Sequence, residues 1–293
     1  MIKFFKYNSC GNDFIIIDNR DESFLINSIN IKKLCDRKFG IGADGLILLE
    51  KSSDANYFMN YFNSDGFMSS FCGNGNLCCA HFAYHLGIFE IKNKAIEGKF
   101  STREGVFNLR IIDNKVIISM PDIKNYNIQK KQICQDIVIN TGSPHYVIFR
   151  DTLNALDINA EACLIRNSKL YKDEGINVNF VDSQMLREDS KFRNSTIIDV
   201  RTYERGVESE TLSCGTGVVA SAISEVICYI LNLNSPTLPL NFSHSTKVNT
   251  LGGVLNVEFH CYYQKKNNSF NFNFSNILLS NNVDMVFQGT IPF

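Results

Sequence analysis

The sequence predicts an α+β fold of two pseudo-symmetric domains, each a curled, mostly antiparallel β-sheet or barrel around a central helix. The pattern Cys-Gly-X-Gly occurs at Cys72 and again at Cys214, 142 residues later in a chain of 293 residues. Each copy opens an apolar run with helical spacing. Many short strand-like runs accompany one long helix in each half, which is typical of antiparallel sheets rather than of a parallel α/β sheet. An internal duplication accounts for both observations.

The charge balance favours a small-molecule partner. Lys and Arg number 29 against 30 Asp and Glu, and neither sign forms a long block, so no nucleic-acid surface is expected. The N-terminus lacks the hydrophobic region of a signal peptide. The most apolar helix candidate, residues 218–231, carries Glu225 and is shorter than the roughly 20 residues of a membrane span. We therefore expect a cytoplasmic protein without a membrane partner.

The ten cysteines are scattered and form no Cys-X-X-Cys pair. Most lie inside apolar runs, which predicts buried reduced thiols rather than a disulfide framework; these are Cys35, Cys78, Cys79, Cys163 and Cys228. His81 and His85 are four residues apart beside Cys78, but no carboxylate or further ligand is suitably spaced. No metal site is expected.

The first half is expected to begin with two strands around a polar turn at residues 8–13. The glycine-rich segment 40–45 precedes an apolar run rather than joining a strand to a helix, which excludes a dinucleotide-binding fingerprint. Helices are predicted at residues 31–38 and 77–86. Strands are predicted at residues 2–7, 14–18, 46–49, 57–62, 95–100, 105–112 and 115–120.

Pro121 marks a plausible domain boundary, and the polar segment 122–132 is predicted to be a linker or loop. The second half repeats the plan of the first. Its helices are expected at residues 159–165 and 218–231. Its strands are expected at residues 137–141, 146–150, 177–181, 196–201, 238–242, 254–262 and 270–278.

Each repeated cysteine lies where a helix begins. Free backbone N–H groups and the helix dipole at that end favour an anion, and they lower a thiol pKa from its usual value of about 8.5. Two such thiols suit a reaction in which one removes a proton from carbon and the other delivers a proton to the opposite face, without a cofactor. The neighbouring N–H groups would hold an amino-acid carboxylate and stabilise developing charge.

Eight ordered segments make the chain resemble the diaminopimelate epimerase family from about residue 3 to residue 217. A weaker echo occurs at Leu251–Gly253 and at the C-terminus. The eight segments are Gly11–Phe14, Gly40–Gly45, Asn63–Gly66, Cys72–Gly75, Gly142–His145, Gly175–Phe180, Tyr203–Gly206 and Glu210–Gly217.

The resemblance implies an isomerase independent of pyridoxal phosphate, which interconverts LL- and meso-diaminopimelate for lysine and peptidoglycan precursors. It implies that the C-terminal strand returns to the first domain, which gives domains of residues 1–120 plus about 282–293 and of residues 121–281. It also implies a homodimer.

The resemblance implies roles for residues at matching positions. Cys72 and Cys214 would be the acid/base pair, and His145 and Glu204 would bias their protonation. Arg205 would hold a carboxylate through its planar fork. The full set of substrate-binding residues would be Asn12, Asn63, Gly73, Asn74, Ser143, Asn177, Glu204, Arg205, Gly215 and Thr216.

The chain departs from the family pattern at several positions. Leu77 stands where Arg is frequent, and Ser143 replaces an Asn that binds substrate, so a water is expected between Ser143 and the ligand. Cys10 adds a third thiol near the expected pocket. Val207–Glu210 carries one extra residue, and Ser280–Val283 lacks a familiar Gly-Pro. The two repeated cysteines are unchanged.

Two alternatives remain open from the sequence. A proline or hydroxyproline racemase-like enzyme would share the two-domain fold and the cysteine pair, but Asn63, Asn177 and Arg205 suit a substrate with a second polar amino-acid end. A weakened, non-catalytic binding or thiol protein is the alternative from another class. Epimerase activity under reducing conditions distinguishes them.

Overall fold

The computed structural model describes residues 1–69, 71–92, 95–129, 135–187, 192–233 and 239–292. The chain divides into two compact units. Unit 1 comprises Met1–Ser119 together with Ser280–Phe293, and unit 2 comprises Met120–Leu279.

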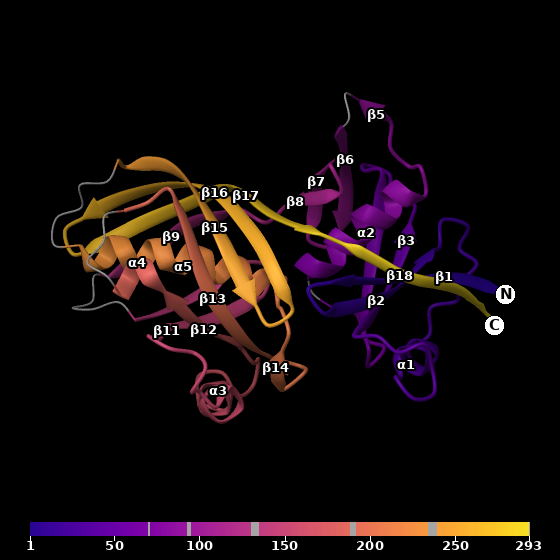
Figure 1. Ribbon diagram of the computed structural model, residues 1–293, viewed down its shortest axis with the longest axis horizontal. Coiled ribbons are helices and arrows are strands. Elements are labelled where there is room, and N and C mark those ends of the chain that lie inside the picture. The colour runs from indigo at the N-terminus through magenta and orange to yellow at the C-terminus, as the bar shows by residue number, and fades with distance from the viewer. Residues whose placement is uncertain (70, 93–94, 130–134, 188–191, 234–238, 293) are drawn as a thin grey trace. The chain divides into compact units, whose positions relative to one another are not determined.

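Unit 1 is a curled sheet with two helices. The sheet includes β1 (Ile2–Ser9), β2 (Asn12–Asp18), β3 (Gly45–Glu50), β4 (Tyr57–Asn63), β5 (Ile91–Lys92), β6 (Ala95–Thr102), β7 (Gly105–Ile112), β8 (Lys115–Ser119) and β18 (Asp284–Ile291). Most neighbouring strands are antiparallel, whereas β2 with β3 and β4 with β6 are parallel. The C-terminal strand β18 pairs with β1, so both chain ends lie in unit 1 (Figure 1).

The sheet of unit 1 surrounds helix α2 (Gly73–His85), while α1 (Ser28–Cys35) lies outside it (Figure 1). The residues of α2 from Gly73 to Ala80 are all buried, and the helix contacts strands β1, β2, β3, β4 and β8. The first part of the helix is therefore enclosed on all sides, as in a core helix, while Tyr84 and His85 at its end are exposed. The ring of Phe5 packs on that of Phe82 with centroids 4.8 Å apart.

Unit 2 has the same general plan. Its strands are β9 (Ile123–Gln129), β10 (Asp136–Asn140), β11 (Pro144–Phe149), β12 (Asn177–Ser183), β13 (Ser195–Glu204), β14 (Ser209–Thr211), β15 (Asn241–Thr250), β16 (Gly253–Lys266) and most of β17 (Ser269–Asn282). The pairs β11 with β12 and β13 with β15 are parallel, and the other described pairs are antiparallel.

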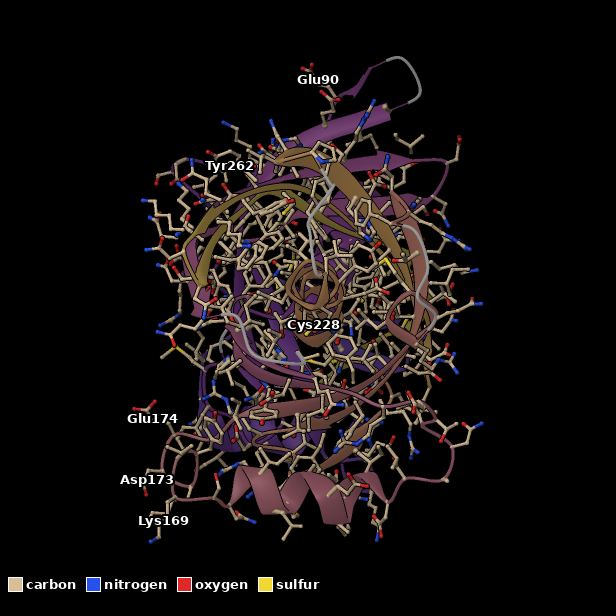
Figure 2. The ribbon with its side chains drawn as sticks, turned by 90° about the vertical axis from the view of Figure 1, so that its left-hand side faces the viewer. Glu90, Lys169, Asp173, Glu174, Cys228 and Tyr262 are labelled. Atoms are coloured by element: carbon tan, nitrogen blue, oxygen red, sulfur yellow. The ribbon has the colours of Figure 1, made fainter. Side chains whose placement is uncertain are left out.

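Helix α5 (Gly215–Asn232) runs through the middle of unit 2, and α3 (Ile158–Arg166) and α4 (Gln184–Arg187) are shorter. Figure 2 looks along α5, which is enclosed by curved strands, with Cys228 labelled on it. By length and composition α5 could cross a membrane, but 94% of its residues are buried inside the structure. It is longer than the predicted run, because the helix already begins directly after Cys214.

The predicted fold class is confirmed, since each unit has a curled, mostly antiparallel sheet around one buried helix. The prediction of a loop at residues 122–132 is wrong over 123–129, which form β9 and pair with β17; residues 130–132 lie outside the described ranges. Most β9 side chains after Ile123 are exposed or half-buried. A polar strand with little buried surface has the composition of a loop.

Several element boundaries also differ from the predictions. Helix α1 begins three residues early, because the side chain of Asn27 caps it by accepting from the Ile29 N–H at 2.8 Å. Strand β15 begins at Asn241 rather than near residue 238, which lies outside the described ranges. The short elements β5, β14 and α4 are too brief for a periodic pattern to reveal.

The thiol prediction is confirmed for most of the named cysteines. Cys35, Cys78 and Cys79 are free and buried, and Cys163 is free but half-buried. Cys228 is disulfide-bonded, so its prediction as a reduced thiol is wrong. An apolar helical position indicates that a cysteine is buried, but it does not reveal whether the sulfur is free or disulfide-bonded.

Candidate active site

Cys72 occupies the N-cap of α2, with an extended backbone at φ −115°. Its Sγ accepts a hydrogen bond from the Gly75 N–H at 3.3 Å. A Cβ on Gly75 would lie 3.0 Å from Met59 Cε and 3.4 Å from Cys72 Sγ, which leaves no comfortable room for a side chain. The glycine therefore permits the close approach of the first helical turn to the thiol.

The side-chain oxygen of Asn12 faces the same thiol, with Oδ1 at 3.8 Å from Cys72 Sγ. The Asn12 Nδ2 group donates to Asp44 Oδ2 at 2.8 Å. A carboxylate only accepts hydrogen bonds, so Asp44 must face the amide nitrogen. The orientation of Asn12 is therefore fixed, with its oxygen toward Cys72.

Asp44 belongs to a charged network behind Asn12. One nitrogen of Arg37 bridges Asp13 Oδ1 at 2.7 Å and Asp44 Oδ1 at 2.8 Å. The buried Lys6 ammonium lies 2.7 Å from Asp13 Oδ2. Burial opposes ionisation of Asp13, but the hydrogen bonds and charges of Arg37 and Lys6 prevail and lower its pKa to about 2. Asp13 thus stays ionised and holds Arg37 in place.

Asn74 and Asn63, the other predicted substrate-binding side chains of unit 1, each take part in hydrogen bonds near the ends of their elements. Asn74 is fully buried, and its Oδ1 lies 3.4 Å from Ser9 Oγ. Asn281 donates to Ser9 Oγ and to Cys10 Sγ, and burial raises the pKa of Cys10. The half-buried Asn63 ends β4, where its backbone N–H bonds to the carbonyl of Phe67.

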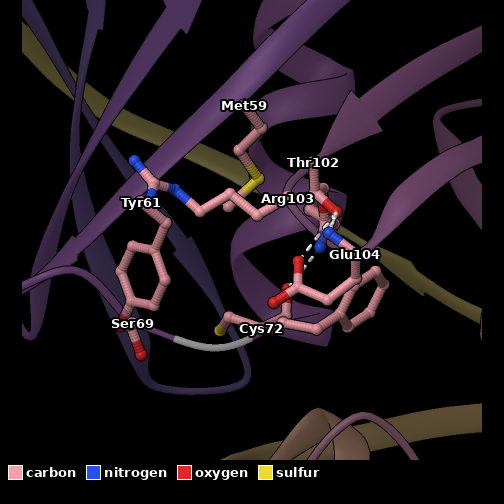
Figure 3. Close-up of a pocket in the computed structure, with 9 residues that line it drawn as sticks. Met59, Tyr61, Ser69, Cys72, Thr102, Arg103 and Glu104 are labelled. Atoms are coloured by element: carbon pink, nitrogen blue, oxygen red, sulfur yellow. Dashed lines mark hydrogen bonds between the residues drawn. The ribbon is translucent and has the colours of Figure 1, made fainter.

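A small pocket lies beside Cys72 (Figure 3). The hairpin between β6 and β7 contributes Thr102, Arg103 and Glu104 to its lining, and Thr102 Oγ1 donates to Glu104 Oε2 at 2.9 Å. Met59 and Tyr61 line it from β4. Cys72 therefore lines a small pocket within unit 1. Leu77, at the position of the missing Arg, is fully buried.

Cys214 occupies the equivalent N-cap of α5, with φ −120°. Its side chain makes no capping hydrogen bond; instead, Sγ lies 3.5 Å from the hydroxyl of Thr216. The Thr216 hydroxyl also lies 2.9 Å from His145 Nε2. Thr141 Oγ1 donates to the Thr216 carbonyl at 2.8 Å, which fixes the first turn of the helix.

His145 is completely buried between two polar neighbours. Its Nδ1 accepts from Asn179 Nδ2 at 3.0 Å, and Asn179 Oδ1 accepts from Thr202 Oγ1 at 3.0 Å. Burial, followed by the positive charge of Arg205, lowers the pKa of His145 to about 3. The imidazole is therefore neutral near pH 7, and it carries its proton on Nε2, facing Thr216.

A second polar group in unit 2 gathers Ser143, Asn177 and Arg205. Asn177 Nδ2 donates to Ser143 Oγ at 3.0 Å, and Asn177 Oδ1 accepts from the Arg205 N–H at 3.0 Å. The Arg205 guanidinium donates to the Glu174 carbonyl at 2.9 Å. Glu204 accepts from Thr211 Oγ1 at 2.5 Å.

The structure reveals supporting residues that the sequence analysis did not single out, chiefly Asp44, Asn179 and Thr202. Asn179 follows Asn177 by two residues on β12, so both side chains lie on one face of the strand. The two-residue repeat of a β-strand could therefore have identified Asn179 from the sequence. Thr202 and Asp44 carried no comparable signal. Among the described residues, no group of three or more His, Cys, Asp or Glu could hold a metal ion.

Several related sequences are named diaminopimelate epimerases. One from Flavobacterium psychrophilum is 41% identical over 292 residues, which cover 99% of this chain and 100% of the relative. One from Aquifex aeolicus is 35% identical and covers 84% of this chain and 92% of the relative.

Solved structures support the fold at much lower identity. A phenazine biosynthesis protein of the PhzF family from Bacillus anthracis superposes with a TM-score of 0.66 at 12% identity, covering 100% of this chain and 99% of that one. A probable proline racemase from Agrobacterium radiobacter gives a TM-score of 0.64, also at 12% identity, with 100% and 93% coverage. At such identities the likeness concerns the fold alone.

The sequence model described as diaminopimelate epimerase matches residues 4–122 and 137–268, which is most of the chain. Together with relatives that are 35–41% identical over most of their length, this match shows that the chain belongs to the diaminopimelate epimerase family.

Proposed function

We propose that this protein is an isomerase that interconverts LL- and meso-diaminopimelate without pyridoxal phosphate, on the route to lysine and peptidoglycan precursors. The observation that carries the proposal is the pair of half-buried cysteine thiols at equivalent helix starts in the two units. The 41% identity to a diaminopimelate epimerase over nearly the whole chain supports the same substrate.

The proposed chemistry uses Cys72 and Cys214 as two independent acid/base groups. One thiolate removes the proton from the α-carbon, and the other thiol delivers its own proton to the opposite face. The first helical turns present the backbone N–H groups of Gly73, Asn74, Gly215 and Thr216. Such donors hold a carboxylate and stabilise the charge that develops on it as the proton leaves.

The distal part of the substrate is proposed to bind through Asn12, Asn63, Ser143, Asn177, Glu204 and Arg205. The hydrogen bond from the Arg205 N–H to Asn177 ties two of these residues together. Because the Asn177 amide is already committed to Ser143, Pro144 and Arg205, it is preorganised before substrate arrives. Preorganised polar groups of this kind favour a substrate with a second amino-acid end over a small cyclic one.

The remaining features of the proposal are the assembly, location and domain limits. We propose a homodimer in the cytoplasm, with domains of residues 1–120 plus about 282–293 and of residues 121–281. The two compact units, which divide near Ser119 and near Leu279, support these limits.

The test is the stereochemical analysis of LL-diaminopimelate after incubation with the purified, reduced protein. We expect meso-diaminopimelate to accumulate, and we expect Cys72→Ala and Cys214→Ala each to lower the rate at least about 100-fold, because each removes one acid/base group. Proline and hydroxyproline should not be racemised.

The matched control is Cys163→Ser, which changes another free, half-buried thiol and keeps a hydroxyl within reach of Tyr203. It should retain activity, and circular dichroism should show that all three variants fold. Near-normal epimerisation by either alanine variant would contradict the assigned roles. Racemisation of proline without action on diaminopimelate would favour the racemase alternative.

A further inference from the structure

Asp44 connects two of the predicted substrate-binding residues of unit 1. Its Oδ2 accepts from Asn12 Nδ2 at 2.8 Å and from the Asp13 N–H at 3.2 Å. Its backbone carbonyl accepts from the N–H of Ser64, which directly follows Asn63, at 3.0 Å. A single residue before β3 therefore holds both the side chain of Asn12 and the turn that follows Asn63.

The backbone of Asp44 is itself held in place by the neighbouring strands. Its N–H donates to the Asp13 carbonyl and to Asp13 Oδ1, both at 3.0 Å. The next residue, Gly45, pairs with Asn63 across β3 and β4. A Cβ on Gly45 would lie 2.6 Å from the Phe62 carbonyl oxygen, so a glycine is required where these strands meet. Asp44 is thus fixed relative to β2, which carries Asn12, and to β4, which carries Asn63.

Arg37 fixes the direction of the Asp44 carboxylate. Its guanidinium donates to both carboxylate oxygens of Asp13, at 2.7 and 3.0 Å, and to Asp44 Oδ1 at 2.8 Å. Because Arg37 holds Oδ1 of Asp44, the other oxygen faces Asn12. The buried Lys6 ammonium lies 2.7 Å from Asp13 Oδ2. Two positive and two negative side chains take part, so the network orients groups without adding net charge.

The loop after α1 presents Arg37 to the two carboxylates. Helix α1 ends at Cys35, and the loop folds back on it through the N–H groups of Ile41 and Gly42, which donate to the Leu34 carbonyl at 2.9 and 3.0 Å. Gly42 has φ +80°, and a Cβ there would lie 3.0 Å from Arg37 Cα. Glycine therefore allows the chain to return closely past Arg37.

The network is better suited to holding side chains in position than to holding the fold together. The side chains of Arg37 and Asp44 are 58% and 42% exposed, and water weakens ion pairs at such sites, so the pair adds little to stability. Its geometry is nonetheless well defined, because one planar guanidinium makes three hydrogen bonds of 2.7–3.0 Å.

We propose that Arg37 and Asp44 are positioning residues of the active site, which hold Asn12 in the orientation that binds substrate. The inference rests on the proposed function, in which Asn12 contacts diaminopimelate. Arg37 orients Asp44, and Asp44 orients Asn12; neither charged residue contacts the substrate itself. Substrate then meets an amide that is already in place, so binding does not have to order it.

Asp44→Asn tests the proposal without changing the side-chain volume. The new amide has one oxygen, so it can accept from Arg37 or from Asn12 and turns its NH2 group against the other donor. We expect the KM for LL-diaminopimelate to rise at least about 10-fold, as for the loss of one hydrogen bond to a charged group, with a smaller change in kcat. The urea midpoint should stay close to that of the wild-type protein. An unchanged KM would overturn the proposal.

A double-mutant cycle distinguishes positioning from a general structural role. If Asp44 acts through Asn12, adding Asp44→Asn to the Asn12→Ala protein should raise its KM by no more than about 2-fold. The backbone carbonyl that supports the turn after Asn63 is present in every variant. The same increase in KM with and without the Asn12 side chain would contradict action through Asn12.

Arg37→Gln removes the fork that holds Asp44 and should raise the KM as well, so an unchanged KM would contradict the role of Arg37. Arg37→Lys should restore the KM only in part, because one ammonium group does not reproduce the planar fork. The matched control is Asp18→Asn, which removes a carboxylate that pairs with Arg20 at 2.7 Å on β2. It should leave the KM unchanged, and an increase as large as that of Asp44→Asn would contradict a specific role of Asp44.

A measurement without substrate separates this inference from the proposed function. Nitrogen-15 relaxation reports how rigidly the side-chain amide of Asn12 is held in the free protein, and Asn12→Ala identifies its signal. We expect an ordered amide in the wild-type protein and a more mobile one in Asp44→Asn. Equal mobility in the two proteins would overturn the inference. An ordered amide in a protein that does not epimerise diaminopimelate would contradict the proposed function alone.

Discussion

His145 shows how burial of one residue controls the chemistry of its neighbours. A fully buried imidazole without a carboxylate partner resists protonation, and its pKa falls to about 3. The ring can therefore serve as a fixed donor from Nε2 instead of titrating with pH. Because burial lowers the pKa of His145, the stability of the folded protein should depend on pH.

We predict that His145 makes the protein less stable in acid. The unfolded imidazole has a pKa of about 6.5 and the folded one about 3, so the unfolded state binds a proton first as pH falls below 6.5. Between pH 7.5 and 4.5 the proton uptake should lower the free energy of unfolding of the wild-type protein by about 2–3 kcal/mol. Measured by urea unfolding, His145→Gln should not show this decrease. The control is His85→Gln, which changes an exposed histidine. Identical pH dependences for all three proteins would contradict the account.

At the residue scale, sequence reasoning identifies groups that do chemistry better than groups that hold them. Cys72 and Cys214 stand out because the same short pattern surrounds both. Asp44 and Thr202 carry no such mark, because their importance lies in directions of hydrogen bonds between residues distant in sequence, at separations of 32 and 23 residues. The directions of these hydrogen bonds follow from the three-dimensional arrangement of the side chains.

The two central helices both begin after a residue type that is unusual at the N-cap. Ser, Thr, Asp and Asn are the usual N-cap residues, whereas α2 and α5 begin after cysteines, and Cys214 makes no capping hydrogen bond. A cap of ordinary type would add about 1 kcal/mol. Such a local departure from helix-forming rules is expected where function selects the residue.

Helix α5 also carries Glu225, a fully buried carboxyl group. Burial raises its pKa to about 7, even though Ser183 donates to it at 2.5 Å and Thr196 at 2.7 Å. His244 Nε2 lies 4.0 Å away, but burial lowers the pKa of His244 to about 4. Around pH 6 both groups are therefore mainly neutral, and no ion pair compensates for burial of the carboxyl group.

We predict that Glu225 destabilises the protein as pH rises. The folded pKa of about 7 exceeds the unfolded value of 4.5, so the stability that Glu225 contributes below pH 4.5 is lost as pH rises through 7, by roughly 2–3 kcal/mol. Glu225→Gln cannot ionise and should gain that amount relative to the wild-type protein between pH 5 and 8, measured by urea unfolding. Glu258→Gln, at an exposed site on β16, is the control. A constant difference across this range would show that Glu225 does not titrate there.

Among the elements, apolar periodicity predicts the core helices and most strands, and it fails where an element buries little. The polar composition of residues 122–132 predicts a loop, whereas residues 123–129 form β9 through backbone pairing with β17, about 150 residues away. Cross-strand hydrogen bonds of that range leave no local trace in the sequence.

For the molecule as a whole, the duplicated plan was readable from the sequence. Each compact unit contains one enclosed helix that begins directly after a cysteine. The first and last strands of the chain lie side by side in unit 1, because β18 pairs with β1. This return was expected only from resemblance to the family, since β18 is largely exposed and has weak apolar alternation. The disulfide state of Cys228 was not predictable from its apolar surroundings.

The most direct test of the two-thiol account is to follow solvent deuterium through the first turnovers. If one thiolate removes the α-proton and a different, solvent-equilibrated thiol supplies the new one, early meso-diaminopimelate formed from LL-diaminopimelate in deuterated water should carry deuterium at the inverted carbon. Unreacted substrate should keep its protium, and the reverse reaction should behave in the same way with Cys72 and Cys214 in exchanged roles. Substantial retention of substrate protium in the first product would contradict two independent thiols and favour a single base that returns the proton it removed.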